Sequence, residues 1–194
     1  MKLGIFGGTF NPIHNGHLIN AQAIKEEHYL NKIIFLPTKD PVHKSLENIT
    51  STDDRFEMVR LSIEDTCGFD VSRMEIDRKS KSYTITTLKQ LMKKYKDDRL
   101  YLIIGSDAFE QIDTWKDYQK VMQMVELIIM KRPGFTYNKE SIYNIAGNVM
   151  ISNNPYIEIS SSDIRKRIRE GKSIRYLVPP KVEEYIVKRG LYRN

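Results

Sequence analysis

The chain opens with a short apolar run, residues 2–6, which leads into Gly7-Gly8-Thr9-Phe10-Asn11-Pro12-Ile13-His14-Asn15-Gly16-His17. An apolar run that ends in two glycines predicts a strand followed by a turn. Residues 16–30 have the spacing of a helix, which would start directly after that turn. Backbone N–H groups at a helix start face outward and favour an anion, so this stretch predicts a phosphate-binding site.

Two imidazoles stand at the predicted helix start. His14 and His17 are three residues apart and therefore lie on one face. Imidazole N–H groups can donate hydrogen bonds to a triphosphate, and protonation would add positive charge. Gly7 and Gly8 let the backbone approach a ligand closely. The stretch matches neither the Gly-x-Gly-x-x-Gly fingerprint nor the Walker loop, so it would bind phosphate by a different device.

Strand-like and helix-like runs alternate along the rest of the chain. The apolar runs predict strands at 33–36, 100–104, 127–130 and 149–151, one or two strands within 69–77, and helices at 53–66, 84–95, 161–170 and 181–188. This alternation indicates an α/β, Rossmann-like fold, with a doubly wound, mostly parallel sheet and helices on both faces. In such a sheet, ligands bind at the carboxyl ends of the strands.

Composition limits the classes of protein that fit. With 194 residues, 40% of them hydrophobic, and no repeat or linker, we expect a single domain over residues 1–194. No apolar run approaches the roughly 20 residues of a membrane span, and no signal peptide precedes the first strand. A single cysteine, Cys67, fits a reducing cytoplasm. The net charge of +6 suits anionic partners.

A second candidate phosphate site lies near the end of the chain, at Ile159-Ser160-Ser161-Ser162-Asp163-Ile164-Arg165. Serines before a helical pattern are good N-caps, and the helix start they cap can bind an anion. Arg165 would lie about one turn into the helix, where a guanidinium can stabilise a leaving pyrophosphate. Taken alone, this segment also fits a capped surface helix with a basic face.

Together the two segments resemble one family. His14, Gly16 and His17 resemble the His-x-Gly-His signature of the nucleotidyltransferases, and the lead-in Gly-Gly-Thr-Phe-Asn-Pro resembles the bacterial nicotinate-mononucleotide adenylyltransferases. The late segment resembles that family's Ile-Ser-Ser-Ser-x-Ile-Arg element. The resemblance implies transfer of AMP from ATP to nicotinate mononucleotide, giving deamido-NAD and pyrophosphate, with Mg²⁺ held by the phosphates. It also implies that a helical part at about 160–194 completes the ATP site.

The resemblance assigns roles to individual residues. It implies catalytic roles for His14, His17, Lys44 and Arg165, and ATP-binding roles for Gly7, Gly8, Thr9, Phe10, Gly105, Asp107, Ile159, Ser160 and Ser161. Asp107 is also the candidate side chain for contact with Mg²⁺, for which no cage of protein ligands is expected. Lys44 follows Pro41-Val42-His43, where the family usually has Pro-Pro-His, so one proline of that loop is replaced.

A separate set of residues is assigned to the mononucleotide. Ser82-Tyr83-Thr84-Ile85-Thr86-Thr87-Leu88 resembles the family's Ser-Tyr-Thr-x-x-Thr-Leu, and a helix start at Thr84 can accept the carboxylate of nicotinate. Trp115 offers an indole face for stacking on the pyridine ring. Arg132, after the strand at 127–130, is the candidate for the mononucleotide phosphate.

Other functions remain open at this point. Another His-x-Gly-His enzyme, such as a phosphopantetheine adenylyltransferase, would share the first segment. A non-catalytic nucleotide- or RNA-binding module would fit the basic charge, although we expect no nucleic acid and no membrane as partners. A zinc site built from His14, His17, His43 and Cys67 matches no standard ligand spacing. The sequence leaves open whether two copies form a homodimer, and how strongly the acid is preferred over the amide.

Overall fold

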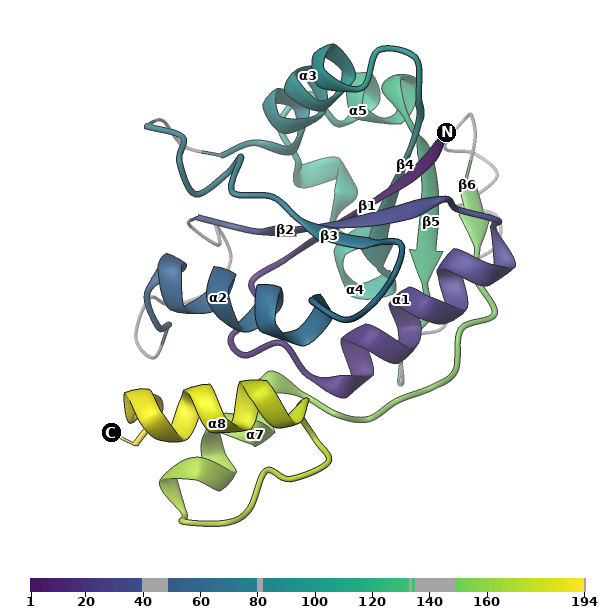
Figure 1. Cartoon of the computed structure of the whole chain (residues 1–194). Helices are drawn as coiled ribbons and strands as arrows, with labels where there is room; N and C mark the ends of the chain where they lie inside the picture. Colours follow the sequence, from purple (N-terminus) through teal and green to yellow (C-terminus); the bar gives the residue numbers. More distant parts are fainter. Residues whose placement is uncertain (40–48, 80–81, 133, 135–148, 194) are drawn as a thin grey trace.

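A six-stranded parallel sheet lies at the centre of the protein (Figure 1). The computed structural model describes residues 1–39, 49–79, 82–132, 134 and 149–193. The strands are β1 (Lys2–Gly8), β2 (Lys32–Pro37), β3 (Phe69–Val71), β4 (Arg99–Gly105), β5 (Glu126–Met130) and β6 (Val149–Ile151). Their order is β3-β2-β1-β4-β5-β6, and every neighbouring pair is parallel. The predicted α/β fold with a doubly wound parallel sheet is confirmed.

The strand order reverses its direction between β1 and β4. From β1 the chain moves outward to β2 and β3, and it then returns to the other side of β1 to form β4, β5 and β6. In sheets of this kind, a crevice opens at the carboxyl ends of the two strands that flank this switch point. β1 ends at Gly8 and β4 ends at Gly105, so the segments that follow these two glycines border the crevice.

Both faces of the sheet are buried. Side chains alternate between the two faces along each strand, so successive residues enter different hydrophobic clusters. On β2, Ile33 and Phe35 belong to one hydrophobic cluster, while Ile34 and Leu36 belong to the other. This explains why the strands read as continuous apolar runs in the sequence.

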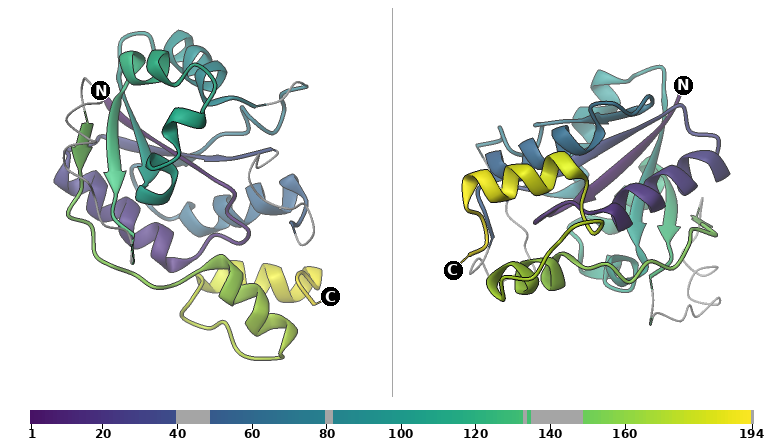
Figure 2. Two further views of the ribbon diagram at one scale, coloured as in Figure 1. Left: turned by 180° about the vertical axis from the view of Figure 1, so that it is seen from behind. Right: turned by 60° about the horizontal axis from the view of Figure 1, so that its bottom comes forward.

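Helices cover the two faces (Figures 1 and 2). One cluster packs the sheet against α1 (Asn15–Glu27) and α2 (Thr52–Ile63). The other packs it against α3 (Thr84–Lys94), α4 (Ser106–Phe109), the 3₁₀ turn η1 (Ile112–Thr114) and α5 (Tyr118–Met124). The late helices α7 (Ser161–Arg169) and α8 (Pro180–Arg189) join the first cluster through Ile164, Val182 and Ile186.

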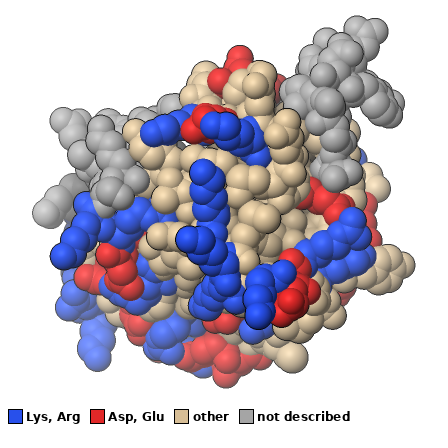
Figure 3. Space-filling view, turned by 90° about the horizontal axis from the view of Figure 1, so that it is seen from above, with Lys and Arg blue, Asp and Glu red and all other residues tan. Residues whose placement is uncertain are grey.

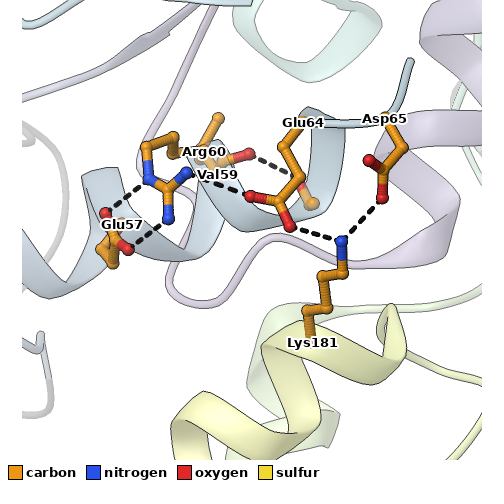
Figure 4. Close-up of polar contacts among 7 residues, drawn as sticks. Glu57, Val59, Arg60, Glu64, Asp65 and Lys181 are labelled. Atoms are coloured by element: carbon orange, nitrogen blue, oxygen red, sulfur yellow. Dashed lines mark hydrogen bonds and ion pairs between the residues drawn. The ribbon is translucent and has the colours of Figure 1, made fainter.

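Polar contacts fasten α8 to α2 (Figure 4). Lys181 of α8 forms ion pairs with Glu64 and Asp65, the latter at 2.7 Å. In the middle of α8, the Tyr185 hydroxyl donates a hydrogen bond of 2.8 Å to Asp54. Helix α8 is therefore anchored to α2, the helix that follows β2.

One predicted element is shorter than expected. Residues 69–77 were predicted to form one or two strands, but β3 ends at Val71. The N–H of Ser72 still bonds to the Phe35 carbonyl at 2.9 Å, and the chain then turns, with the Asp77 N–H bonding to the Arg73 carbonyl at 2.9 Å.

That residues 1–194 form one domain stays a prediction. Across the described ranges, no helix has the length and apolar character needed to cross a bilayer.

Candidate active site

The two imidazoles at the start of α1 are stacked on each other. The ring centroids of His14 and His17 lie 3.6 Å apart, with 27° between the planes. The His14 backbone N–H donates to Nδ1 of His17 at 3.2 Å. In a neutral His17 the proton therefore lies on Nε2, which makes that atom a donor. The Phe10 ring meets His17 edge-on, with centroids 5.1 Å apart, and supports this orientation.

His14 is neutral in the folded protein. Its side chain is buried, and this burial, aided by the positive charge of Arg132, lowers its pKa to about 3. His14 therefore adds no positive charge at neutral pH. Its Nδ1 is buried and has no hydrogen-bond partner among the described residues. Gly16 leaves room for the ring, because a Cβ there would lie 3.1 Å from that Nδ1.

The two glycines that were predicted to form a turn are the last residues of β1, and one of them faces open space. A Cβ at Gly7 would meet no atom of the described structure within 4 Å, whereas one at Gly8 would lie 2.8 Å from the Phe10 ring. The Phe10 side chain is only 2% exposed and packs against Phe6 and Phe35. The predicted ATP contact of Phe10 is thus not available to its side chain, because this ring is part of the core.

The late serine-led segment lies directly against the early one. Ser160 caps α7, with its Oγ accepting from the Asp163 N–H at 3.0 Å. The Ser161 hydroxyl donates to the Pro12 carbonyl at 2.8 Å. Arg165 donates to the Asn11 carbonyl at 2.8 Å, while its Nε is buried without a hydrogen-bond partner among the described residues. The predicted meeting of the two segments is confirmed, and their binding of one polyanion stays a prediction.

An ion pair stands at the carboxyl end of β4. Arg132 Nε lies 3.2 Å from Oδ1 of Asp107, and the Arg132 backbone N–H donates to the Ser106 hydroxyl at 3.2 Å. A Cβ at Gly105 would collide with both charged side chains, so the glycine makes this arrangement possible. The charge of Arg132 also reaches His14, as the lowered pKa shows.

Of the three residues assigned to the mononucleotide, Thr84 and Trp115 lie near the start of α3, whereas Arg132 lies beside Asp107 at the carboxyl end of β4. Thr84 is the first residue of that helix, and the preceding Tyr83 makes no side-chain capping hydrogen bond. Lys116 Nζ lies 4.7 Å from the centroid of the Tyr83 ring. The adjacent Trp115 packs partly buried against the cluster on the α3 side of the sheet. The structure thus brings Thr84 and Trp115 into one neighbourhood.

Of two other predicted residues, only one lies within the described part of the chain. Lys44 lies outside the described residues. Ile159 is partly buried and packs against the cluster shared by α1, α2 and α7, so its side chain supports the start of α7.

The sequence analysis assigned no role to three residues near the site: Arg55, Asn11 and Tyr192. Arg55 is 0% exposed and bonds to backbone carbonyls of the loops after β1 and β2. Asn11 Oδ1 accepts from the Thr50 N–H at 3.2 Å and from the Tyr192 hydroxyl at 2.8 Å. A signal for Arg55 was present, since it stands four residues before Val59 and so lies on the buried face of the predicted helix.

The positive charge is concentrated beside the late segment. Residues 160–194 contain ten Lys and Arg and four Asp and Glu, a net charge of +6 that equals the charge of the whole chain. On the face above α3 and α5, by contrast, acidic and basic side chains lie side by side (Figure 3). The potential near Arg165 therefore favours a polyanionic ligand.

Comparisons with known proteins agree on one family. The cytidylyltransferase-like family model matches residues 5–167. A protein of Desulfitobacterium hafniense (strain Y51), named "probable nicotinate-nucleotide adenylyltransferase", is 44% identical over 198 residues, covering 99% of this chain and 96% of its own. A protein of the same name from Caldicellulosiruptor saccharolyticus is 43% identical over 199 residues and covers 100% of both chains.

Solved structures share the fold. The Plasmodium falciparum nicotinic acid mononucleotide adenylyltransferase complexed with APC superposes with a TM-score of 0.82, at 22% identity, over 98% of this chain and 96% of its own. The same enzyme complexed with NaAD gives a TM-score of 0.79, at 22% identity, over 98% of this chain and 97% of its own.

Proposed function

The chain belongs to the nicotinate-nucleotide adenylyltransferases of the cytidylyltransferase-like family, and we propose that it transfers AMP from ATP to nicotinate mononucleotide. The products are deamido-NAD and pyrophosphate, so the reaction is a step in the biosynthesis of NAD. The family relationship supports this assignment over its whole length, since the relatives and this chain cover each other almost completely.

The contact between Arg165 and the Asn11 carbonyl carries the proposal. It joins the helix start with the two imidazoles to the helix start with the serines, at the switch point of the sheet. Two helix N-termini and a guanidinium on one surface suit a triphosphate better than a single phosphate. Each of these helix starts also holds a buried side-chain nitrogen without a hydrogen-bond partner among the described residues, His14 Nδ1 in one and Arg165 Nε in the other.

The reaction is a substitution at the α-phosphorus of ATP. A 5′-phosphate oxygen of the mononucleotide forms the new P–O bond, and the bond from the α-phosphorus to the oxygen bridging to the β-phosphorus breaks. Pyrophosphate leaves with the electron pair of that bond. Such transfers require positioning and charge stabilisation more than covalent participation of the protein.

The residues divide into groups with different roles. The Nε2–H of His17, the neutral ring of His14 and the Arg165 guanidinium stabilise charge on the triphosphate and the leaving group. The start of α3 at Thr84 binds the nicotinate carboxylate, and the Trp115 indole stacks on the pyridine ring. Arg132 binds a phosphate.

Mg²⁺ is proposed to accompany the triphosphate. Within the described residues, no three His, Cys, Asp or Glu side chains are close enough together to hold a metal. Asp107 offers one carboxylate, whose buried Oδ1 makes no hydrogen bond within that part of the chain, although Arg132 Nε lies 3.2 Å away. One carboxylate together with substrate phosphates is a usual donor set for Mg²⁺, which neutralises phosphate charge when bound.

The proposal is tested by supplying ATP with nicotinate mononucleotide, nicotinamide mononucleotide or phosphopantetheine in turn, with and without Mg²⁺. Pyrophosphate release and the dinucleotide product are both measured. We expect release with nicotinate mononucleotide and Mg²⁺, and much less with the other acceptors. Faster release with phosphopantetheine, or no release with any acceptor, contradicts the proposal.

A further inference from the structure

Arg55 is a buried cation that donates hydrogen bonds to several backbone carbonyls. It is 0% exposed, although it is the second residue after Asp53 in the first turn of α2. Its NH1 donates to the Thr9 carbonyl at 2.7 Å, and its NH2 donates to the Thr38 carbonyl at 2.7 Å and to the Lys39 carbonyl at 3.2 Å. A guanidinium can serve several acceptors at once because its donors form a rigid planar fork.

These carbonyls lie where the pairing of β1 and β2 ends. The last backbone bond between the two chain segments runs from the Thr38 N–H to the Gly8 carbonyl, at 2.9 Å. Beyond it the two loops separate, and the next carbonyls along each, those of Thr9 and Thr38, both bond to Arg55. Beyond the last backbone hydrogen bond between the two segments, the guanidinium of Arg55 connects them instead.

Holding a carbonyl also fixes the N–H of the same peptide unit. The Thr9–Phe10 and Thr38–Lys39 peptide bonds are trans, so each N–H points away from the carbonyl that Arg55 holds. Within the described residues, neither the Phe10 N–H nor the Lys39 N–H makes a hydrogen bond. Arg55 thus orients two backbone donors at the carboxyl edge of the sheet, beside the end of β1.

We propose that Arg55 is a positioning residue for ATP: it holds the loops after β1 and β2 so that the N–H groups of Phe10 and Lys39 can donate to phosphate oxygens. This inference rests on the proposed function for the identity of the ligand. Arg55 itself does not touch the substrate. Its effect passes through the two peptide units, and lysine cannot replace it, because one ammonium group cannot bond to carbonyls on both loops with the same geometry.

The test compares Arg55→Lys with Arg60→Lys. Arg60 lies on the same helix but pairs with Glu57 and Glu64 (Figure 4). Binding of a non-hydrolysable ATP analogue is measured by calorimetry, and KM for each substrate is measured by pyrophosphate release. We expect Arg55→Lys to weaken ATP binding by about tenfold, the effect of losing a hydrogen bond made by a charged group. Its KM for the mononucleotide stays within about twofold, and Arg60→Lys behaves as the parent protein.

A purely structural role predicts a different pattern. In that case Arg55→Lys lowers the melting temperature but leaves ATP affinity unchanged at temperatures well below melting, or weakens both substrates equally, and either result overturns the proposal. If Arg55→Lys does not fold, Arg55→Ala is assayed with added methylguanidinium, which restores ATP affinity if the proposal holds. Failure of both variants to fold also overturns it. If the parent protein releases no pyrophosphate, the proposed function fails, while calorimetry still tests the role of Arg55.

Discussion

Arg165 donates a hydrogen bond of 2.8 Å to the backbone carbonyl of Asn11, a residue 154 positions earlier in the chain. Ser161, one turn before Arg165, bonds in the same way to the carbonyl of Pro12. The late helix is therefore fixed to the early loop through the main-chain carbonyls of residues 11 and 12.

Replacing Arg165 with lysine tests this attachment. A lysine keeps the charge but loses the planar fork that can bond to the Asn11 carbonyl and to a phosphate together. We expect kcat/KM for ATP to fall by about tenfold to a hundredfold. Arg169→Lys is the control, because Arg169 is exposed on the same helix. Equal behaviour of the two variants would contradict a role for Arg165 at the phosphates.

His17→Ala tests the donor at the start of α1. The variant removes a hydrogen-bond donor that is proposed to act as the pyrophosphate leaves, so kcat should fall by about 10²–10³. The circular dichroism spectrum should stay that of the parent, since His17 is only partly buried. His28→Ala, at the other end of α1, serves as the control. Near-normal turnover by His17→Ala rules out the assigned role.

The pKa of His14 predicts how stability depends on pH. The pKa is about 3 in the folded protein, against an ordinary value of 6.5 for histidine. Between these values the unfolded chain binds a proton that the folded protein does not, so stability falls as the pH drops through this range. One such group contributes a slope of up to about 1.4 kcal/mol per pH unit.

Urea unfolding of the parent and of His14→Gln measures this slope. Between about pH 7 and about pH 4, the free energy of unfolding of the variant should depend less on pH than that of the parent. The pKa of His28 is also lowered by burial, but this contribution is common to both proteins. Identical slopes would show that His14 takes up its proton normally in the folded state.

Trp115 provides a test of the mononucleotide side. Loss of a ring that stacks on a base costs about 1–3 kcal/mol, so Trp115→Ala should raise KM for the mononucleotide by about tenfold or more. KM for ATP should change little, and Trp115→Phe should keep most of the affinity because a ring remains. If Trp115→Ala raises both KM values together, Trp115 acts through packing in the core and does not stack on the pyridine ring.

The sequence predicted the elements of the fold well because both faces of the sheet are buried. Strands such as β4 and β5 read as unbroken apolar runs, and the helix predicted at 53–66 is found at Thr52–Ile63. Residues 69–77 were over-extended as strand, since nothing in their pattern shows that pairing with β2 stops at Val71. The order in which strands pair also depends on long-range packing, which periodicity does not encode.

The candidate site was predictable only in part. The spacing of His14 and His17 and the serines before Arg165 are local patterns that indicate helix starts. The spacing of Arg55 from Val59 indicates that Arg55 is buried, but not what it binds. The partners of Arg55 and Tyr192 could not be assigned from local patterns, because Thr9 and Asn11 lie 46 and 181 residues away. The burial that lowers the pKa of His14 likewise depends on long-range packing, which the local sequence does not show.

Tyr192, whose hydroxyl bonds to Asn11, has a consequence for the order of events during protein synthesis. A ribosome adds Tyr192 to the chain 181 residues after Asn11, so β1 and α1 can fold before this hydrogen bond to Asn11 can form. We expect a growing chain to bury much of its core before it can bind ATP. Activity would then start only after translation has passed Tyr192.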